Sequence, residues 1–127
     1  MKVESLIFDM DGTLWDSAEK VAESWTAVLK EQPDVDMVVT EADIKAIMGM
    51  PMDAIARKMF GEYPEKRQEE LIDACGDFEN NYLRQHGGKL YDGVEDTLAK
   101  LSENHRLYIV SNCQSGYIEA FLEHYGF

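Results

Sequence analysis

The most informative stretch of the chain runs Leu6-Ile7-Phe8-Asp9-Met10-Asp11-Gly12-Thr13-Leu14. The apolar run from Val3 to Phe8 is typical of a buried strand, and Gly12 allows a sharp turn directly after it. Residues two apart on an extended backbone project to the same side, so Asp9 and Asp11 are expected to lie close together. Two neighbouring carboxylates repel each other and therefore favour a bound cation or a shared proton. Hard oxygen ligands with room for water suit Mg²⁺.

The residues after these two acids favour an anion beside the cation. Gly12 exposes backbone N–H groups at the turn, and Thr13 adds a hydroxyl donor. A calcium loop between two helices is excluded, because such a loop needs glycine at its sixth position and an acid at its twelfth. Counted from Asp9, those positions hold Leu14 and Lys20. The motif therefore predicts a phosphoryl group held against Mg²⁺.

A second strand is predicted from Arg106 to Val110, ending at Ser111-Asn112. Residues 94–101 before it and residues 118–125 after it both carry apolar side chains at helical spacing. The order strand, helix, strand, helix is typical of an α/β domain with a parallel sheet.

The stretch between the two strands is too long for a single crossover helix and is helical throughout. Its predicted helices begin at Asp16, where Glu19 completes a capping box, at Thr40 with Asp43, near Ile55, and after Pro64. We therefore expect residues 16–86 to form a helical insert, and residues 1–15 and 87–127 to form the α/β core. An insert at the carboxyl end of a parallel strand lies where such sheets bind ligands. A lid is the leading interpretation, and a separate helical domain without an active-site role is the alternative.

Composition restricts the partners and the compartment. Among 127 residues there are 12 Lys plus Arg and 25 Asp plus Glu, so the formal net charge is −13. This balance argues against nucleic acid and against anionic membrane surfaces as partners. Cys75 and Cys113 lack the spacing of a zinc site or a redox pair, and the apolar run Leu6–Phe8 is too short for a signal peptide or a membrane span. The sequence predicts a cytoplasmic protein.

Both strand-end motifs resemble those of a known family. The stretch Leu6–Leu14 resembles the first signature of the haloacid dehalogenase-like superfamily, and Ser111-Asn112 resembles its second. The insert is similar to the helical cap of the phosphoglycolate phosphatase and β-phosphoglucomutase branch. The resemblance implies a Rossmann-like parallel sheet core, incomplete in this chain, with an inserted α-helical cap domain.

The same resemblance implies a role for each motif residue. Asp9 would be the nucleophile that forms an aspartyl-phosphate, and Asp11 would be the general acid and base. The Asp9 carboxylate and the Asp11 backbone carbonyl would hold the cofactor, Mg²⁺. The phosphoryl oxygens of a small phosphorylated metabolite would be bound by Gly12, Thr13, Ser111 and Asn112. An acid at Asp11 favours phosphoryl transfer over dehalogenation, because a carbon-bound halide needs no protonation.

Further residues of the insert have candidate roles. The resemblance implies that the loop Met48–Met52 reaches the active site and selects the leaving group, whereas methionines at this spacing are also common core filler. Arg57 and Lys58 could meet a second anionic group of the substrate or lie on the surface. The aromatic residues Trp25, Phe78 and Tyr82 are expected to be packed between the helices of the insert.

The resembled family has two further signatures, a lysine and an acidic pair, which would follow strands beyond Phe127. We therefore expect this chain to be an N-terminal portion that is inactive alone, with an uncovered sheet edge through which it could associate. A phosphatase is the preferred function. The alternatives are a phosphomutase of the β-phosphoglucomutase type and a non-catalytic fragment whose cap is a helical interaction module.

Overall fold

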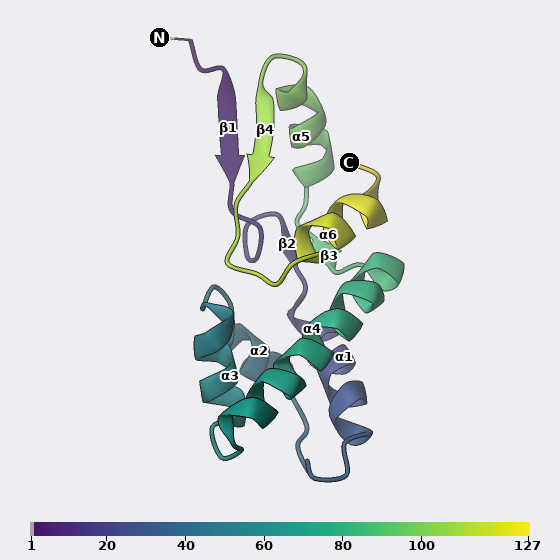
Figure 1. The fold of residues 1–127 in the computed structure, drawn as a ribbon. Coiled ribbons are helices and arrows are strands. Elements are labelled where there is room, and N and C mark those ends of the chain that lie inside the picture. The colour runs from purple at the N-terminus through teal and green to yellow at the C-terminus, as the bar shows by residue number, and fades with distance from the viewer. Residues whose placement is uncertain (1) are drawn as a thin grey trace.

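A computed structural model describes residues 2–127, which form a small parallel sheet flanked by helices and a group of helices beside it (Figure 1). The elements are β1 Ser5–Phe8, β2 Trp15–Asp16, α1 Ala18–Lys30, α2 Glu41–Ile47, α3 Met52–Phe60, α4 Glu65–His86, β3 Lys89–Leu90, α5 Val94–Ser102, β4 Arg106–Ile109 and α6 Tyr117–Tyr125. Within residues 2–127, no helix is both long enough and apolar enough to cross a membrane.

The parallel sheet consists of β1 and β4, paired from Ser5↔Arg106 to Phe8↔Ile109. The predicted α/β class with a parallel sheet is therefore confirmed. On one face of the sheet, α5 contacts β4, and a cavity of about 710 Å³ is lined by residues of β1, β4, α5 and α6. The other face is open, since Ile7 is 71% exposed and Val110 is 63% exposed. Association of the chain through its uncovered sheet stays a prediction.

A second, antiparallel pair was not foreseen from the sequence. β2 and β3 pair Trp15 with Leu90 and Asp16 with Lys89, which joins the two ends of the helical insert. A backbone bond from the amide of Tyr91 to the carbonyl of Leu14 extends this contact at 3.2 Å. Strands of two residues are too short to produce an alternating pattern, which is why periodicity did not reveal them.

The predicted starts of the helices had different outcomes. Thr40 and Asp43 form the expected capping box, with the Asp43 amide donating to Thr40 Oγ1 at 3.2 Å and the Thr40 amide donating to Asp43 Oδ2 at 2.9 Å. The predicted box of Asp16 and Glu19 is wrong. Asp16 belongs to β2, so α1 starts two residues later at Ala18, whose amide donates to Asp16 Oδ1 at 3.1 Å.

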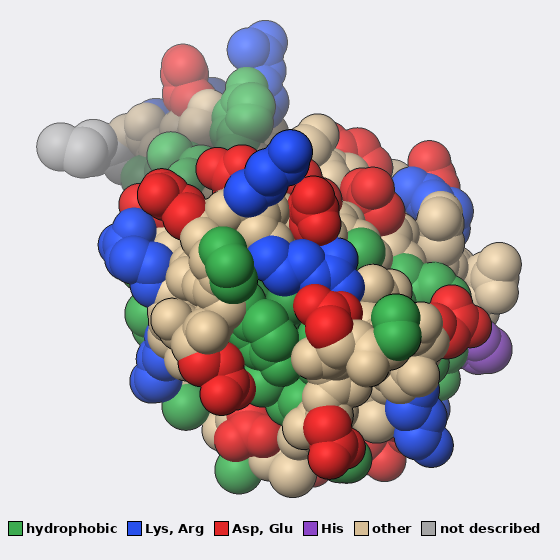
Figure 2. Space-filling view, turned by 60° about the horizontal axis from the view of Figure 1, so that its bottom comes forward, with side chains coloured by type: hydrophobic (Ala, Val, Ile, Leu, Met, Phe, Trp, Pro, Cys, Tyr) green, Lys and Arg blue, Asp and Glu red, His purple; other side chains and the backbone are tan. Residues whose placement is uncertain are grey.

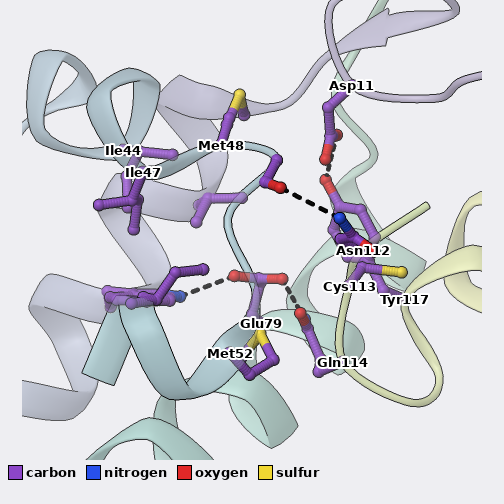
Figure 3. A pocket seen from close by; sticks show the side chains of 14 residues that line it. Asp11, Ile44, Ile47, Met48, Met52, Glu79, Asn112, Cys113, Gln114 and Tyr117 are labelled. Atoms are coloured by element: carbon purple, nitrogen blue, oxygen red, sulfur yellow. Dashed lines mark hydrogen bonds between the residues drawn. The ribbon is translucent and has the colours of Figure 1, made fainter. Parts of the chain in front are cut away.

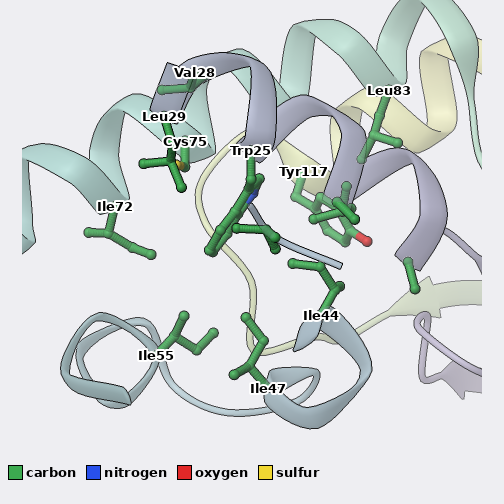
Figure 4. Packing of buried hydrophobic residues seen from close by; sticks show 14 of the residues in the cluster. Trp25, Val28, Leu29, Ile44, Ile47, Ile55, Ile72, Cys75, Leu83 and Tyr117 are labelled. Carbon is green, nitrogen blue, oxygen red and sulfur yellow. The ribbon is translucent and has the colours of Figure 1, made fainter. Parts of the chain in front are cut away.

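The apolar interior of the insert lies between α1, α4 and the short helices α2 and α3 (Figure 4). Trp25 is buried and stacks on Phe60 with ring centroids 6.4 Å apart, as expected for an aromatic residue between helices. The same expectation was wrong for Phe78, which is 43% exposed and stacks on Tyr82 at the surface of α4. The buried stripe of α4 passes one residue later, through Glu79, and so includes a carboxyl group in its apolar face.

The charged side chains of the insert are distributed over its surface. Figure 2 shows Lys and Arg side chains interspersed among the acids on the visible face. Arg67 is the best-connected of these cations, since it donates to Asp34, Glu70 and Gln32 and thereby joins α4 to the segment after α1. The excess of acids is therefore not gathered into a single patch on that face.

Replacing Leu83 by alanine tests the packing of α4. Leu83 is fully buried, so Leu83→Ala is expected to lower the free energy of unfolding by about 2–5 kcal/mol through lost burial and a residual cavity. Urea denaturation followed by circular dichroism measures the change. The matched control, Asp73→Ala on the exposed side of the same helix, should change the free energy by no more than about 0.5 kcal/mol. Equal effects of the two variants would contradict the assigned helix face.

Candidate active site

The carboxyl ends of β1 and β4 meet at one edge of the sheet because the strands are parallel. A cavity of about 390 Å³ lies there, lined by Asp9, Asp11, Met48, Gly49, Val110, Ser111 and Asn112. Four of the six predicted site residues are therefore brought together. They come from two loops about 100 positions apart in the sequence, which the register of the sheet places side by side.

Gly12 and Thr13 lie outside this lining. Gly12 has a φ of 77°, which confirms the expected sharp turn after the strand. Its amide donates to the carbonyl of Trp15 at 3.0 Å, and the Thr13 amide donates to the carbonyl of Met10 at 3.2 Å. Both amides thus close the turn in this structure, and a role of Gly12 and Thr13 in binding phosphate stays a prediction.

The Asp11 carboxyl is held by three donors that the sequence analysis did not identify. Its Oδ1 accepts hydrogen bonds from Tyr117 Oη at 2.6 Å, Trp15 Nε1 at 3.0 Å and Ser17 Oγ at 3.5 Å. Burial nevertheless raises the pKa of Asp11, with these bonds opposing the rise and the nearby Asp9 adding to it. Asp9 itself is exposed, so the two acids of the motif have different surroundings.

The donor set at this edge fits a hydrated Mg²⁺ ion. Such an ion is commonly bound by one or two carboxylates and retains several waters. Asp9 supplies one exposed carboxylate beside a cavity open to solvent, and Asp11 lines the same cavity. Among residues 2–127 no cluster of three or more acidic, histidine or cysteine side chains could enclose a metal, so a closed, all-protein cage is not what these residues provide.

The helical insert contributes to the cavity through the loop between α2 and α3. Met48 and Gly49 line it, and Asn112 Nδ2 donates to the Gly49 carbonyl at 3.3 Å. Gly49 has a φ of 84°, a conformation that favours glycine at this contact. The loop Met48–Met52 thus touches the loop that carries Ser111-Asn112.

Arg57 and Lys58 lie away from this cavity. Arg57 pairs with Asp53 on α3, and Lys58 Nζ donates to the carbonyl of Ala46, each at 3.5 Å. Both side chains are exposed, which agrees with the surface placement considered for them.

A second, smaller cavity of about 50 Å³ lies between the insert and the core (Figure 3). Glu79 of α4 lines it and is only 4% exposed. Its Oε1 accepts a hydrogen bond from Trp25 Nε1 at 2.7 Å, and its Oε2 accepts one from the side-chain amide of Gln114. Burial raises the pKa of Glu79 from its ordinary value of 4.5 to about 7, with both hydrogen bonds opposing the rise.

Asn80 adjoins Glu79 and fastens α4 to the same loop. Asn80 Nδ2 donates to the carbonyl of Ser115 at 2.7 Å, and the Gln114 amide donates to Asn80 Oδ1 at 2.9 Å. A side chain at Gly116 would meet Asn80 Nδ2 at 2.7 Å, so the approach of the loop to α4 requires glycine there. Glu79, Asn80 and Gln114 form what we call the α4 latch, which the sequence did not reveal because isolated polar residues on a helix usually face solvent.

The raised pKa of Glu79 predicts a pH-dependent stability. The folded protein holds a proton on Glu79 that the unfolded chain releases near pH 4.5, so the unfolding free energy should fall as pH rises from about 4.5 to about 7. A shift from 4.5 to about 7 corresponds to roughly 3 kcal/mol. This fall should be smaller by that amount in Glu79→Gln and unchanged in Glu69→Gln, an exposed control on the same helix.

Urea denaturation at several pH values between 4.5 and 8 measures this dependence. The ionisable groups that interact with Glu79 are Asp11, Cys75, Cys113 and Tyr117, and all four remain in both variants. An unchanged pH slope in Glu79→Gln would show that another group carries the dependence.

The model of the family described as haloacid dehalogenase-like hydrolase matches residues 6–127. A predicted phosphatase from Clostridium acetobutylicum has a similar structure, with a TM-score of 0.69 and 22% identity over 98% of this chain and 56% of that one. A HAD hydrolase of family IA, variant 3, from Entamoeba histolytica gives a TM-score of 0.68 and 19% identity, with the same coverage.

At these identities the two structures establish a shared fold. The present chain spans 56% of the length of each. A comparison with the curated proteins gives no match.

Proposed function

The chain belongs to the haloacid dehalogenase-like hydrolase family, and we propose that it carries the nucleophile, the acid–base group and the cap of a Mg²⁺-dependent phosphatase for a small phosphorylated metabolite. One observation carries this proposal. The cavity at the carboxyl ends of β1 and β4 is lined by Asp9 and Asp11 on one side and by Ser111 and Asn112 on the other. The exposed Asp9 and the half-buried Asp11 therefore line the same cavity as the polar side chains of Ser111 and Asn112.

In the first half of the reaction, the exposed Asp9 carboxylate attacks phosphorus and an aspartyl-phosphate forms. The bond between phosphorus and the ester oxygen breaks. Asp11 gives its proton to the departing oxygen, and the raised pKa of this buried carboxyl favours the protonated form that is needed. Trp15 and Tyr117 hold the carboxyl in place through their hydrogen bonds.

In the second half, a water molecule attacks the phosphorus of the aspartyl-phosphate. Asp11, now ionised, takes the proton from that water, and the bond between phosphorus and Asp9 breaks. Inorganic phosphate leaves and Asp9 returns to its carboxylate form, so Asp11 ends the cycle protonated as it began. Ser111 and the amide of Asn112 would hold the phosphoryl oxygens in both halves.

The Asp9 carboxylate and the backbone carbonyl of Asp11 would hold Mg²⁺, which when bound offsets the repulsion between carboxylates and an anionic phosphate. This compensation is needed here because the chain has a net charge of −13. No Lys, Arg or His is among the residues that line the cavity.

Replacing the nucleophile is the first test. Hydrolysis of p-nitrophenyl phosphate is measured with and without Mg²⁺, on this chain and on one extended beyond Phe127. Asp9→Asn is expected to lower kcat about 10³-fold or more wherever activity is found, because no carboxylate remains to attack. Asp73→Asn, an exposed change on α4, should leave kcat unaltered. Full activity of Asp9→Asn, or inactivity of the extended chain, would contradict the proposal.

The acid–base role of Asp11 predicts a dependence on the leaving group. With an alkyl phosphate, Asp11→Asn should lower kcat by about 10²–10⁴-fold, since the alkoxide then departs unprotonated. With p-nitrophenyl phosphate the nitrophenolate leaves readily, so stopped-flow measurements should show a rapid burst followed by slow turnover. If Asp11→Asn slows the first step by the same factor for both substrates, Asp11 is not the proton donor.

A phosphorylated isomer of the substrate as product, in place of inorganic phosphate, would identify a phosphomutase.

A further inference from the structure

The two cavities adjoin at the reacting centre of the proposed phosphatase. They share four lining residues, namely Asp11, Met48, Gly49 and Asn112. Asp11 is the residue proposed to protonate the departing oxygen, so the group attached to that oxygen has to lie next to Asp11. The smaller cavity extends from Asp11 toward the insert and ends at Glu79 (Figure 3).

The walls of the smaller cavity are apolar and close together. They come from α1, α2 and α3 and consist of Val21, Trp25, Ile44, Ile47, Met52 and Ile55. A volume of about 50 Å³ has room for roughly four water-sized spheres at about 10–15 Å³ each. The cavity therefore suits an organic group of only a few non-hydrogen atoms.

The ionisable groups of this lining are acids, a cysteine and a tyrosine. Glu79 and Asp11 are the two carboxyls, and no Lys, Arg or His contributes to the lining. Because Trp25 and Gln114 fix the Glu79 carboxyl, it cannot turn away from an incoming group. A second anion in this apolar space would lie between two carboxyls with no Lys, Arg or His side chain beside it, which is costly, whereas an N–H or O–H donor could be accepted.

We propose that the smaller cavity is the subsite for the leaving group, and that Glu79 makes it select phosphomonoesters of small neutral or amine-bearing alcohols over those with a second anionic group. This inference rests on the proposed function and adds the class of substrate. Glu79 acts here as a specificity-determining residue at the far end of the alcohol. The raised pKa of its carboxyl agrees with an apolar site in which negative charge is unfavourable.

Three esters of similar size test the selection, with inorganic phosphate as the reference. Propyl phosphate, O-phosphoethanolamine, 2-phosphoglycolate and inorganic phosphate are titrated at pH 8 into the full chain with Mg²⁺ present, and Kd is measured by isothermal titration calorimetry. We expect propyl phosphate and O-phosphoethanolamine to bind at least about tenfold more tightly than 2-phosphoglycolate. Equal Kd values for the three esters, or tighter binding of 2-phosphoglycolate, would overturn the inference.

Glu79→Gln separates selection from packing at pH 8, above the pKa of about 7 of Glu79, because glutamine keeps the shape and removes the charge that the carboxyl then carries. The ratio of Kd values for 2-phosphoglycolate and propyl phosphate should fall at least about fivefold in this variant. Glu69→Gln, exposed on the same helix, should keep the wild-type ratio. If Glu79→Gln weakens all three esters by the same factor, Glu79 only supports the α4 latch and the inference is wrong.

Met52→Ala provides a test that does not depend on Glu79. Met52 is half-buried at the wall of the cavity, so its truncation should admit a longer alkyl group and improve the Kd of pentyl phosphate relative to propyl phosphate. An unchanged ratio of the two Kd values would place the leaving group elsewhere.

Binding of inorganic phosphate shows whether the proposed phosphatase or only the proposed subsite is wrong. If inorganic phosphate binds neither to this chain nor to one extended beyond Phe127, the proposed phosphatase fails as well, and if it binds without any selection among esters, only the subsite is wrong.

Discussion

Parallel pairing of β1 with β4 is the constraint on which the candidate site depends. Four residue pairs, from Ser5↔Arg106 to Phe8↔Ile109, align the ends of two strands separated by about 100 positions. A shift of one residue would turn every side chain of one strand to the opposite face. It would also displace Ser111 and Asn112 relative to Asp9 and Asp11. The register is supported by the contact of α5 with β4 on one face of the sheet, since the other face is open.

The sequence predicted the elements whose patterns are local. The apolar runs ending at Asp9 and at Ser111 identified both strands, and the α/β class followed from their order with the helices. It predicted neither β2 nor β3, because two-residue strands carry no periodicity. The capping box at Thr40 was found and the one at Asp16 was wrong, because the tertiary pairing of Asp16 with Lys89 takes precedence over a local preference.

The same distinction applies to the candidate site. Asp9, Asp11, Ser111 and Asn112 stand in short motifs, and the structure places all four around one cavity. The sequence did not identify Tyr117 and Glu79, because the role of each side chain depends on contacts with residues far away in the chain. Tyr117 reaches Asp11 across 106 positions, and Glu79 reaches Trp25 across 54. An acid on an amphipathic helix is usually solvated, and only the packing of α1 against α4 shows that this one is not.

The short pairing of β2 with β3 affects how the sequence and length of the helical insert can change. It holds together the two points where the helical insert leaves and rejoins the core, at Trp15 and Leu90. Because the two ends of the insert are neighbours, the insert does not force β1 and β4 apart. The entropic cost of closing such a segment grows only slowly with its length. The insert can therefore be replaced, lengthened or shortened while β1 and β4 keep their register. Chemistry at the strand ends and selectivity in the insert can then diverge independently, as two separately exchangeable parts of one polypeptide.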